Sequence, residues 1–253
     1  MSGYEQQIKA MVDEHSDYTL SEYCEYWEEK TGVRLSQSAM CRFLKKQNLT
    51  LKKKTLRSSQ AATENNQNKR VEYWEVIRDI APENLVFLDE MGVLLGMMRE
   101  RARSEKGERS YDVKPFYRGS RVTVVGAISQ KSILAVKIIG KSMNAEEFKE
   151  FLTNDLSPQL WEGAAVVMDN LPAHKVKGVK EILESVGARA IYSSPYSPEF
   201  NPIEHLWWNL KAFIRKFIPK SAEVVEKLLS IGIMLCSSKQ LRNYFAHCCY
   251  CTN

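Results

Sequence analysis

The spacing of hydrophobic residues changes along the chain, from helical before Pro82 to strand-like after it. Before Pro82, apolar residues recur with the period of a helix, which predicts amphipathic helices. One helix begins at Thr19, whose spacing to Glu22 is that of a capping box, and another begins at Ser36, after the helix-breaking Gly32. Two short helices joined by a glycine-containing turn are typical of a helix-turn-helix.

The pattern after Pro82 indicates an α/β domain. Short apolar runs predict strands at residues 85–88, 92–98, 121–128, 133–139, 164–168 and 188–192. Helical spacing appears over residues 144–156, 176–186 and 201–217. The order is β-β-β-β-α-β-α-β-α, with strands first and alternation afterwards. This order predicts a mixed sheet flanked by helices.

These patterns divide the chain into four parts. Residues 1–57 are predicted to form a small all-α, winged-helix-like helix-turn-helix domain for DNA binding. Residues 58–81 read as a polar linker that continues into a connecting helix. Residues 82–218 make up the α/β domain, and residues 219–253 form a helical tail.

Composition excludes several classes of protein. With 44% hydrophobic and 26% charged residues, the chain is neither disordered, collagen-like nor a coiled-coil rod. No apolar run approaches the roughly 18 residues that a membrane-spanning helix needs, and the polar start lacks the form of a secretion signal. Six cysteines are too few for a disulfide scaffold. We therefore expect a soluble, cytoplasmic protein that does not enter a membrane.

The positive charge is concentrated in one short segment. The whole chain carries a net charge of +5, but residues 34–57 hold eight Arg and Lys and no acid, which leaves −3 for the other 229 residues. Such a segment predicts a polyanion site, and together with the helix-turn-helix it favours double-stranded DNA over a merely solvated basic face or a plain helical hairpin. The predicted contacts are Gln37, Ser38 and Arg42 at base edges and Lys45, Lys46, Lys52, Lys53 and Lys54 at phosphates.

Three carboxylates are candidates for chemistry. Asp89 and Asp169 each follow a buried apolar run, and Glu204 lies one turn into the helix that begins at Asn201. Hard oxygen ligands at one sheet edge suit Mg²⁺ or Mn²⁺, and two such ions about 3.5–4 Å apart stabilise the attacking and leaving oxygens of a phosphodiester displacement. An Asp also ends many strands as a turn or cap residue, so these residues alone indicate no more than a candidate metal site.

Three segments share a recognisable motif pattern: Leu88-Asp89-Glu90, Val167-Met-Asp-Asn170 with His174-Lys175, and Ser194-Pro-Tyr-Ser-Pro-Glu-Phe-Asn-Pro-Ile-Glu-His-Leu-Trp-Trp208. These segments are similar to the DDE transposases of bacterial insertion sequences, in the branch (the IS-six-thirty group) that is allied to the mariner-like superfamily. Asp169 and Glu204 have 34 residues between them, which is the spacing of that branch. The resemblance runs from about Thr19 to Phe217.

The resemblance implies an RNase H-like catalytic core in residues 82–218. In such a core Asp89, Asp169 and Glu204 hold two divalent ions, Mg²⁺ or Mn²⁺. In the family, one ion activates water to nick DNA at the transposon end, and the freed 3′ hydroxyl attacks target DNA, usually at a TA dinucleotide. No covalent protein–DNA intermediate forms, which agrees with the lack of an obvious Ser, Tyr or Cys nucleophile beside a base.

The resemblance also implies partners and location. Family members act as dimers or larger assemblies on paired terminal inverted repeats, so we expect a homodimer on DNA, in contact with the bacterial nucleoid. They generally carry two helix-turn-helix units before the core, and only one fits this sequence. We therefore expect an upstream-frame portion of the transposase as a further partner, or else a truncated copy. A stand-alone nuclease with the same acids and a DNA-binding repressor without activity are the alternatives.

Several further residues have two interpretations. Asn170, His174 and His205 are candidates to support the metal ligands or to contact DNA, but the two histidines are equally well explained as hydrogen-bonded structural residues. Trp207 and Trp208 are assigned to the core. The cysteine-rich end, His247-Cys-Cys-Tyr-Cys251, resembles half of a zinc site, although a terminal helix docking through Phe245 and Tyr250 explains it better.

Overall fold

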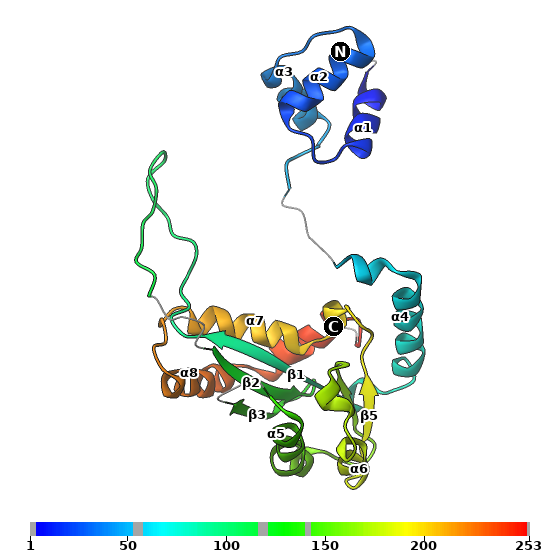
Figure 1. The fold of residues 1–253 in the computed structure, drawn as a ribbon, viewed down its shortest axis with the longest axis vertical. Helices are drawn as coiled ribbons and strands as arrows, with labels where there is room; N and C mark the ends of the chain where they lie inside the picture. The colour runs from blue at the N-terminus through cyan, green and yellow to red at the C-terminus, as the bar shows by residue number, and fades with distance from the viewer. Residues whose placement is uncertain (1–3, 53–57, 116–120, 140–142, 252–253) are drawn as a thin grey trace. The chain divides into compact units, whose positions relative to one another are not determined.

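The computed structural model describes residues 4–52, 58–115, 121–139 and 143–251. The chain forms two compact units, Met1–Arg57 and Ser58–Asn253 (Figure 1). Each unit has a hydrophobic core of its own, so each is described separately.

The first unit is a bundle of three helices, α1 (Glu5–Glu14), α2 (Leu20–Thr31) and α3 (Gln37–Lys46). The predicted capping box is present, since Thr19 and Glu22 each accept a hydrogen bond from the other's backbone N–H. Gly32 ends α2 in the left-handed conformation (φ 68°), which glycine adopts without strain. Residues 4–52 form helices and connections only, so the β-hairpin of a winged helix is not formed among them.

The core of the first unit joins all three helices. It is made of Ile8, Met11, Tyr23, Trp27, Met40, Phe43 and Leu44. Ile8 and Met11 come from α1, which precedes the two helices predicted from the sequence. The apolar face of α3 packs into this core, which leaves the opposite face of α3 free for a ligand.

The second unit is built on a five-stranded sheet in the order β3-β2-β1-β4-β5. The strands are β1 (Leu85–Leu94), β2 (Arg121–Ile128), β3 (Ile133–Ile139), β4 (Ala165–Met168) and β5 (Arg189–Tyr192). Strands β1, β2 and β3 pair antiparallel, whereas β4 pairs parallel with both β1 and β5. The predicted mixed sheet is therefore confirmed.

Strand β1 corrects one prediction. The sequence indicated separate strands at 85–88 and 92–98, with Asp89 directly after the first, but Leu85–Leu94 is a single strand. Asp89 pairs with Gly126 inside the ladder to β2. The parallel pairing of β1 with β4 covers only Leu85–Phe87. Asp89 therefore lies just beyond the end of β4 although its own strand continues, because the longer β2 extends the ladder on the other side.

Helices cover both faces of the sheet (Figure 1). They are α4 (Glu64–Ile77), α5 (Ala145–Glu150) with the π-helical segment Phe151–Leu156, α6 (Val179–Glu184), α7 (Ile203–Ile214), α8 (Ala222–Met234) and α9 (Ser238–His247). Short 3₁₀ turns lie at Ser59–Ala62, Pro82–Asn84, Ser157–Gln159, Pro172–Lys175 and Pro198–Phe200. Side chains of α4, α7, α8 and α9 pack on one face of the sheet, and side chains of α5, the π-helical segment and α6 pack on the other.

The two neighbouring tryptophans of α7 have different environments. Trp207 is buried, as predicted, but Trp208 is 68% exposed, so its assignment to the core is wrong. The buried residues Leu206, Trp207 and Leu210 share one face of α7, and a further rotation of about 100° from Trp207 carries Trp208 off that face.

The C-terminal segment docks through aromatic residues as predicted. Phe245 and Tyr250 are buried, and the Tyr250 hydroxyl donates a hydrogen bond to the Phe200 carbonyl (2.6 Å). The six cysteines are free thiols, and Cys248 is buried in the same cluster. Within the described ranges, no helix is long and apolar enough to cross a membrane.

Candidate active site

The structure brings Asp89, Asp169 and Glu204 to one cavity of about 440 Å³. They arrive from three different elements: the middle of β1, the residue after β4, and the first turn of α7. The loop between β5 and α7, Ser193–Asn201, provides much of the remaining lining. The three carboxylates named from the sequence therefore line the same cavity in the folded chain.

Asp89 carries the most perturbed carboxylate of the cavity. Its removal from solvent, together with the negative charge of Glu204, raises its pKa to about 7. The Trp207 indole donates a hydrogen bond to Asp89 Oδ2 (3.2 Å), which favours the charged form and fixes the direction of the carboxylate. A Cβ atom at Gly126 would come within 2.7 Å of the Trp207 ring. Gly126 therefore makes room for the indole that holds Asp89.

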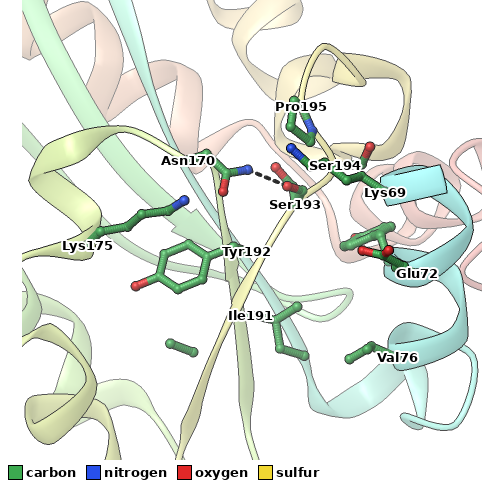
Figure 2. A pocket seen from close by; sticks show the side chains of 12 residues that line it. Lys69, Glu72, Val76, Asn170, Lys175, Ile191, Tyr192, Ser193, Ser194 and Pro195 are labelled. Carbon is green, nitrogen blue, oxygen red and sulfur yellow. Dashed lines mark hydrogen bonds between the residues drawn. The ribbon is translucent and has the colours of Figure 1, made fainter. Parts of the chain in front are cut away.

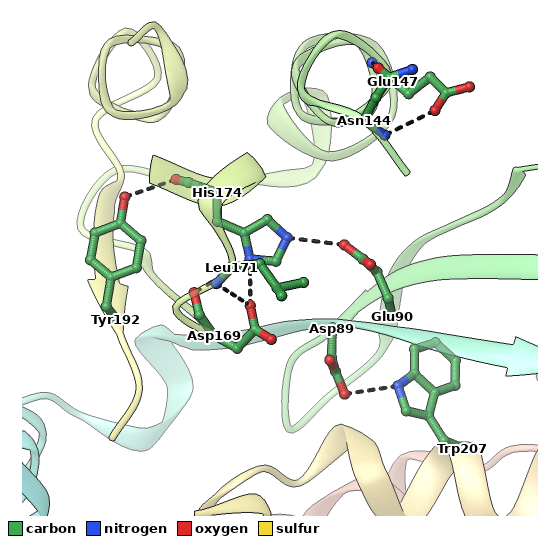
Figure 3. A network of polar contacts seen from close by, with 9 residues as sticks. All are labelled: Asp89, Glu90, Asn144, Glu147, Asp169, Leu171, His174, Tyr192 and Trp207. Atoms are coloured by element: carbon green, nitrogen blue, oxygen red, sulfur yellow. Dashed lines mark hydrogen bonds and ion pairs between the residues drawn. The ribbon is translucent and has the colours of Figure 1, made fainter. Parts of the chain in front are cut away.

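Asp169 is held by a buried histidine (Figure 3). Its Oδ1 atom lies 2.7 Å from Nδ1 of His174, and Nε2 of the same ring lies 3.0 Å from Oε1 of Glu90. Burial by itself would raise the pKa of Asp169, but the hydrogen bonds from His174 and from the Leu171 amide outweigh burial and hold the pKa below its usual range. Asp169 is therefore a preorganised anion.

His174 connects Asp169 to Glu90 across the end of β4. Burial would lower its pKa, but its hydrogen bonds to the two carboxylates prevail and raise the pKa to about 9. The ring also packs against Phe148, with ring centroids 4.2 Å apart, and its carbonyl accepts a hydrogen bond from Tyr192 (2.9 Å). The two interpretations of His174 are thus compatible, because a satisfied structural histidine here also orients Asp169.

Glu90 was not singled out from the sequence. It follows Asp89 directly, and successive residues of a strand point to opposite faces, so the pattern alone places Glu90 away from the acid cavity. The 3₁₀ turn after β4 carries His174 back over β1, and this tertiary contact brings His174 and Glu90 together.

Glu204 lines the cavity and is exposed to solvent. Loss of hydration raises the pKa of its carboxyl, and the charge of Lys211, two turns further along α7, opposes this rise. The next residue, His205, is placed elsewhere: its ring lies near His247 and Tyr244 of α9, at centroid distances of 4.5 and 5.6 Å. The predicted role of His205 beside the metal ligands is therefore not supported, because the helical rotation turns it towards α9.

The loop before Glu204 is anchored by Arg70 of α4. Its Nη1 donates to Ser197 Oγ (3.0 Å), its Nη2 donates to Glu199 Oε1 (2.6 Å), and the guanidinium lies 4.5 Å from the centroid of the Phe200 ring. Arg70 lies in the segment that the sequence indicated to be a linker and connecting helix. No local signal distinguishes it there from neighbouring basic residues, and the contact spans more than a hundred residues of chain.

Asn170 bridges the ends of two parallel strands. Its side-chain amide donates to the Ser193 carbonyl, and it lines both the acid cavity and an adjoining groove of about 510 Å³ (Figure 2). The groove runs between α4 and β5, and the exposed side chains of Lys69 and Lys175 lie along it. Glu72 also lines the groove, so its charged side chains sum to one positive charge, and the groove shares Asn170 with the acid cavity.

The predicted DNA-contact residues of the first unit lie on or after α3. All those that the structure describes are exposed, namely Gln37, Ser38, Arg42, Lys45, Lys46 and Lys52. The Arg42 Nε–H donates to the Ser38 carbonyl one turn earlier (3.3 Å). Lys53 and Lys54 lie outside the described residues.

The carboxylates fit a magnesium-type site, but not a closed cage. In the described part of the chain, no three His, Cys, Asp or Glu side chains are close enough together to hold one ion. Mg²⁺ is commonly held by one or two carboxylates and keeps several waters, which substrate oxygens can replace. A cavity that gathers three carboxylates and raises the pKa of Asp89 suits such open coordination.

Residues 84–225 match the family model described as DDE superfamily endonuclease. The chain belongs to the DDE superfamily endonucleases. The matched range contains the three carboxylates of the cavity, as well as Glu90 and His174, whereas Arg70 lies before it. The first unit lies outside the DDE superfamily endonuclease match.

This DDE superfamily endonuclease is also similar to transposases. It is 31% identical over 103 residues to the transposable element Tcb2 transposase of Caenorhabditis briggsae. That alignment covers 38% of this chain and 37% of the relative, so the similarity spans little more than a third of that protein's length.

Solved structures show the fold. A pre-cleavage Mos1 transpososome matches with a TM-score of 0.80 and 18% identity, over 96% of this chain and 74% of that one. The Mos1 mariner paired-end complex with Mn matches with a TM-score of 0.79 and the same identity and coverage. At this identity the likeness concerns architecture, and it confirms the predicted RNase H-like fold with helices before it.

Proposed function

We propose that this DDE superfamily endonuclease is a DNA transposase, which hydrolyses phosphodiester bonds at transposon ends and joins the freed strand to target DNA. The convergence of Asp89, Asp169 and Glu204 in one cavity carries the proposal. Gathering like charges in a partly buried cavity costs stability unless a cation binds there. The similarity to the Tcb2 transposase and to DNA complexes of Mos1 supports transposition as the reaction.

Each carboxylate has a distinct role in this proposal. Asp89, Asp169 and Glu204 would hold two Mg²⁺ or Mn²⁺ ions, the metals named for solved Mos1 structures. When bound, such ions supply Lewis-acid stabilisation to the attacking and leaving oxygens. The Trp207 indole orients the Asp89 carboxylate, and His174 holds Asp169 in its charged form.

The substrate in this proposal is double-stranded DNA with terminal inverted repeats. The exposed residues of α3 would contact base edges through Gln37, Ser38 and Arg42, and phosphates through the following lysines. The basic groove at Lys69 and Lys175 would accept the backbone near the cavity. The similarity to a Mos1 transposase paired-end complex with its left transposon end supports assembly as a homodimer on two ends.

The finer identity rests on the motif resemblance. The spacing between Asp169 and Glu204 and the Pro-Tyr-Ser-Pro segment support the bacterial insertion-sequence branch, with TA targets and a cytoplasmic, nucleoid-bound location. The same resemblance supports an upstream-frame transposase portion with another helix-turn-helix as a partner. Sequencing the DNA upstream of the gene tests this last point, because the partner requires a helix-turn-helix coding remnant there.

A cleavage and joining assay tests the proposal. The substrate is a labelled duplex carrying the element's terminal repeat, incubated with Mg²⁺ or Mn²⁺ and a target plasmid, with wild type compared with Asp169→Asn. We expect cutting at the repeat end and joining to the plasmid, both abolished in the variant. Binding without cutting by either protein would support a repressor, and cutting without joining would support a stand-alone nuclease.

A further inference from the structure

Trp208 is the one tryptophan of the described chain that the fold leaves on the surface. Its side chain is 68% exposed, whereas Trp27 and Trp207 are buried and Trp74 and Trp161 are partly buried. Trp161 donates its indole N–H to Asn84, and Trp207 donates to Asp89. The exposed indole of Trp208 presents its ring face to solvent, where a planar group of a ligand can stack on it.

Trp208 belongs to a row of polar and aromatic side chains on α7. Glu204, Trp208, Lys211 and Arg215 are spaced by four, three and four residues, which places them on one side of the helix. The buried residues of α7 lie on a different face, at Ile203, Leu206, Trp207, Leu210 and Ile214. The row therefore leads from the acid cavity along one side of α7 to Arg215 just after the helix, with Trp208 exposed and Lys211 and Arg215 partly buried.

The row carries positive charge that the described residues do not neutralise. Neither Lys211 nor Arg215 forms a salt bridge to a carboxylate in the described chain. Lys211 nevertheless lies near enough to Glu204 to oppose the rise in the pKa of that carboxyl. An aromatic face followed by two unpaired cations, beginning at a cavity for phosphodiester chemistry, matches the chemistry of a nucleic acid strand.

We propose that this row binds an unpaired nucleotide of the DNA strand that enters the cavity, with its base stacked on Trp208 and the following phosphates near Lys211 and Arg215. The inference rests on the proposed DNA substrate. A base in a continuous duplex is covered on both faces by its neighbours, so only an unpaired base can stack on the indole. Trp208 thus selects DNA that is opened next to the cut.

The test measures binding of full-length protein to a short single strand that carries one 2-aminopurine base, and to the same sequence as a blunt duplex. EDTA in the buffer removes cutting from the measurement. We expect Trp208→Ala to weaken binding of the single strand by about tenfold, which lies within the range that stacking of one base on an aromatic side chain contributes. The 2-aminopurine fluorescence change should disappear, and duplex binding should stay within about twofold of wild type.

Matched variants keep the result specific. Trp208→Phe should retain part of the affinity, and Phe217→Ala, which removes another exposed aromatic that is not in the row, should change neither readout. Lys45→Gln should weaken duplex binding through the first unit and leave the fluorescence change intact. Equal affinities of Trp208→Ala and wild type for the single strand would overturn the inference, as would equal losses on both probes.

The outcome is separable from that of the proposed function. If Trp208→Ala weakens single-strand binding but the wild-type protein shows no metal-dependent cutting, the transposase proposal is disproved and the row remains a single-strand site. If the wild-type protein cuts at the repeat end in the presence of metal but Trp208→Ala binds the single strand normally, the transposase proposal stands and the single-strand inference for the row is rejected.

Discussion

At the scale of single residues, the acid cavity shifts the pKa values of two of its carboxylates in opposite directions. Asp89 is kept partly neutral by its removal from solvent and by Glu204, whereas Asp169 is kept charged by His174. Two carboxylates of the same cavity therefore differ in protonation near neutral pH. The difference follows from their neighbours, because their ordinary pKa is the same.

The raised pKa of Asp89 predicts a pH-dependent cost to folding. The folded protein binds this proton with a pKa of about 7, and the unfolded chain with a value near 3.8, so stability falls as pH rises between them. Asp89→Asn should remove the cost. In EDTA at pH 8, it should raise the free energy of unfolding by about 2 kcal/mol, after allowance for solvent screening, and by much less at pH 5.

Urea unfolding at both pH values measures the effect of Asp89→Asn. Asp13→Asn, at an exposed position of the first unit, is the matched control and should change stability at neither pH. A gain from Asp89→Asn that is no larger at pH 8 than at pH 5 would contradict the argument.

At the scale of elements, two distant segments determine where Glu204 enters the cavity. Arg70 of α4 holds Ser197 and Glu199, and Tyr250 after α9 holds the Phe200 carbonyl. The loop has no regular backbone pairing of its own apart from one 3₁₀ turn. Its conformation therefore depends on these side chains.

Loss of Arg70 should disturb the position of Glu204 without removing any carboxylate. We expect Arg70→Ala to lower the cutting rate about tenfold and to raise the Mg²⁺ concentration at half-maximal rate, since a small displacement of a ligand weakens metal binding. Arg70→Lys should fall between, because lysine keeps the charge but not the two-pronged geometry.

A Mg²⁺ titration of cutting rate, with DNA binding measured in parallel, tests the role of Arg70. Arg78→Ala is the matched control, since Arg78 follows α4, is exposed, and pairs among the described residues with Asp79 alone. A normal half-maximal Mg²⁺ concentration in Arg70→Ala would show that the loop holds Glu204 without this contact.

At the scale of the whole molecule, the chain is two units with separate cores. The first core is built around Trp27 and Met40, and the second around the sheet. Core residues of one unit do not appear in the core clusters of the other. Each unit should therefore unfold as a cooperative unit of its own.

Separate cores predict separable unfolding transitions. Trp27→Ala should destabilise the first unit by about 3–5 kcal/mol, because a large buried side chain is removed. It should lower the unfolding temperature of the first unit only. Phe87→Ala should do the same to the second unit alone. Differential scanning calorimetry of the full chain measures both, and a single transition that moves as a whole in either variant would contradict two independent units.

Local patterns in the sequence determined much of this protein. The capping box at Thr19, the helix start at Ser36 and the β2–β3 hairpin depend on neighbouring residues, so they could be predicted from spacing alone. Asp89 and Asp169 could be identified from the apolar runs before them, Glu204 from its place at a helix start, and all three from the motif resemblance.

Only the tertiary structure decided the contacts between distant segments. The continuity of β1 through Asp89 depends on pairing with β2, which a single strand's pattern does not show. The links from Glu90 to His174 and from Arg70 to Ser197 join residues more than eighty positions apart. Such contacts form when packing closes long loops, and they leave no periodic signal in the sequence.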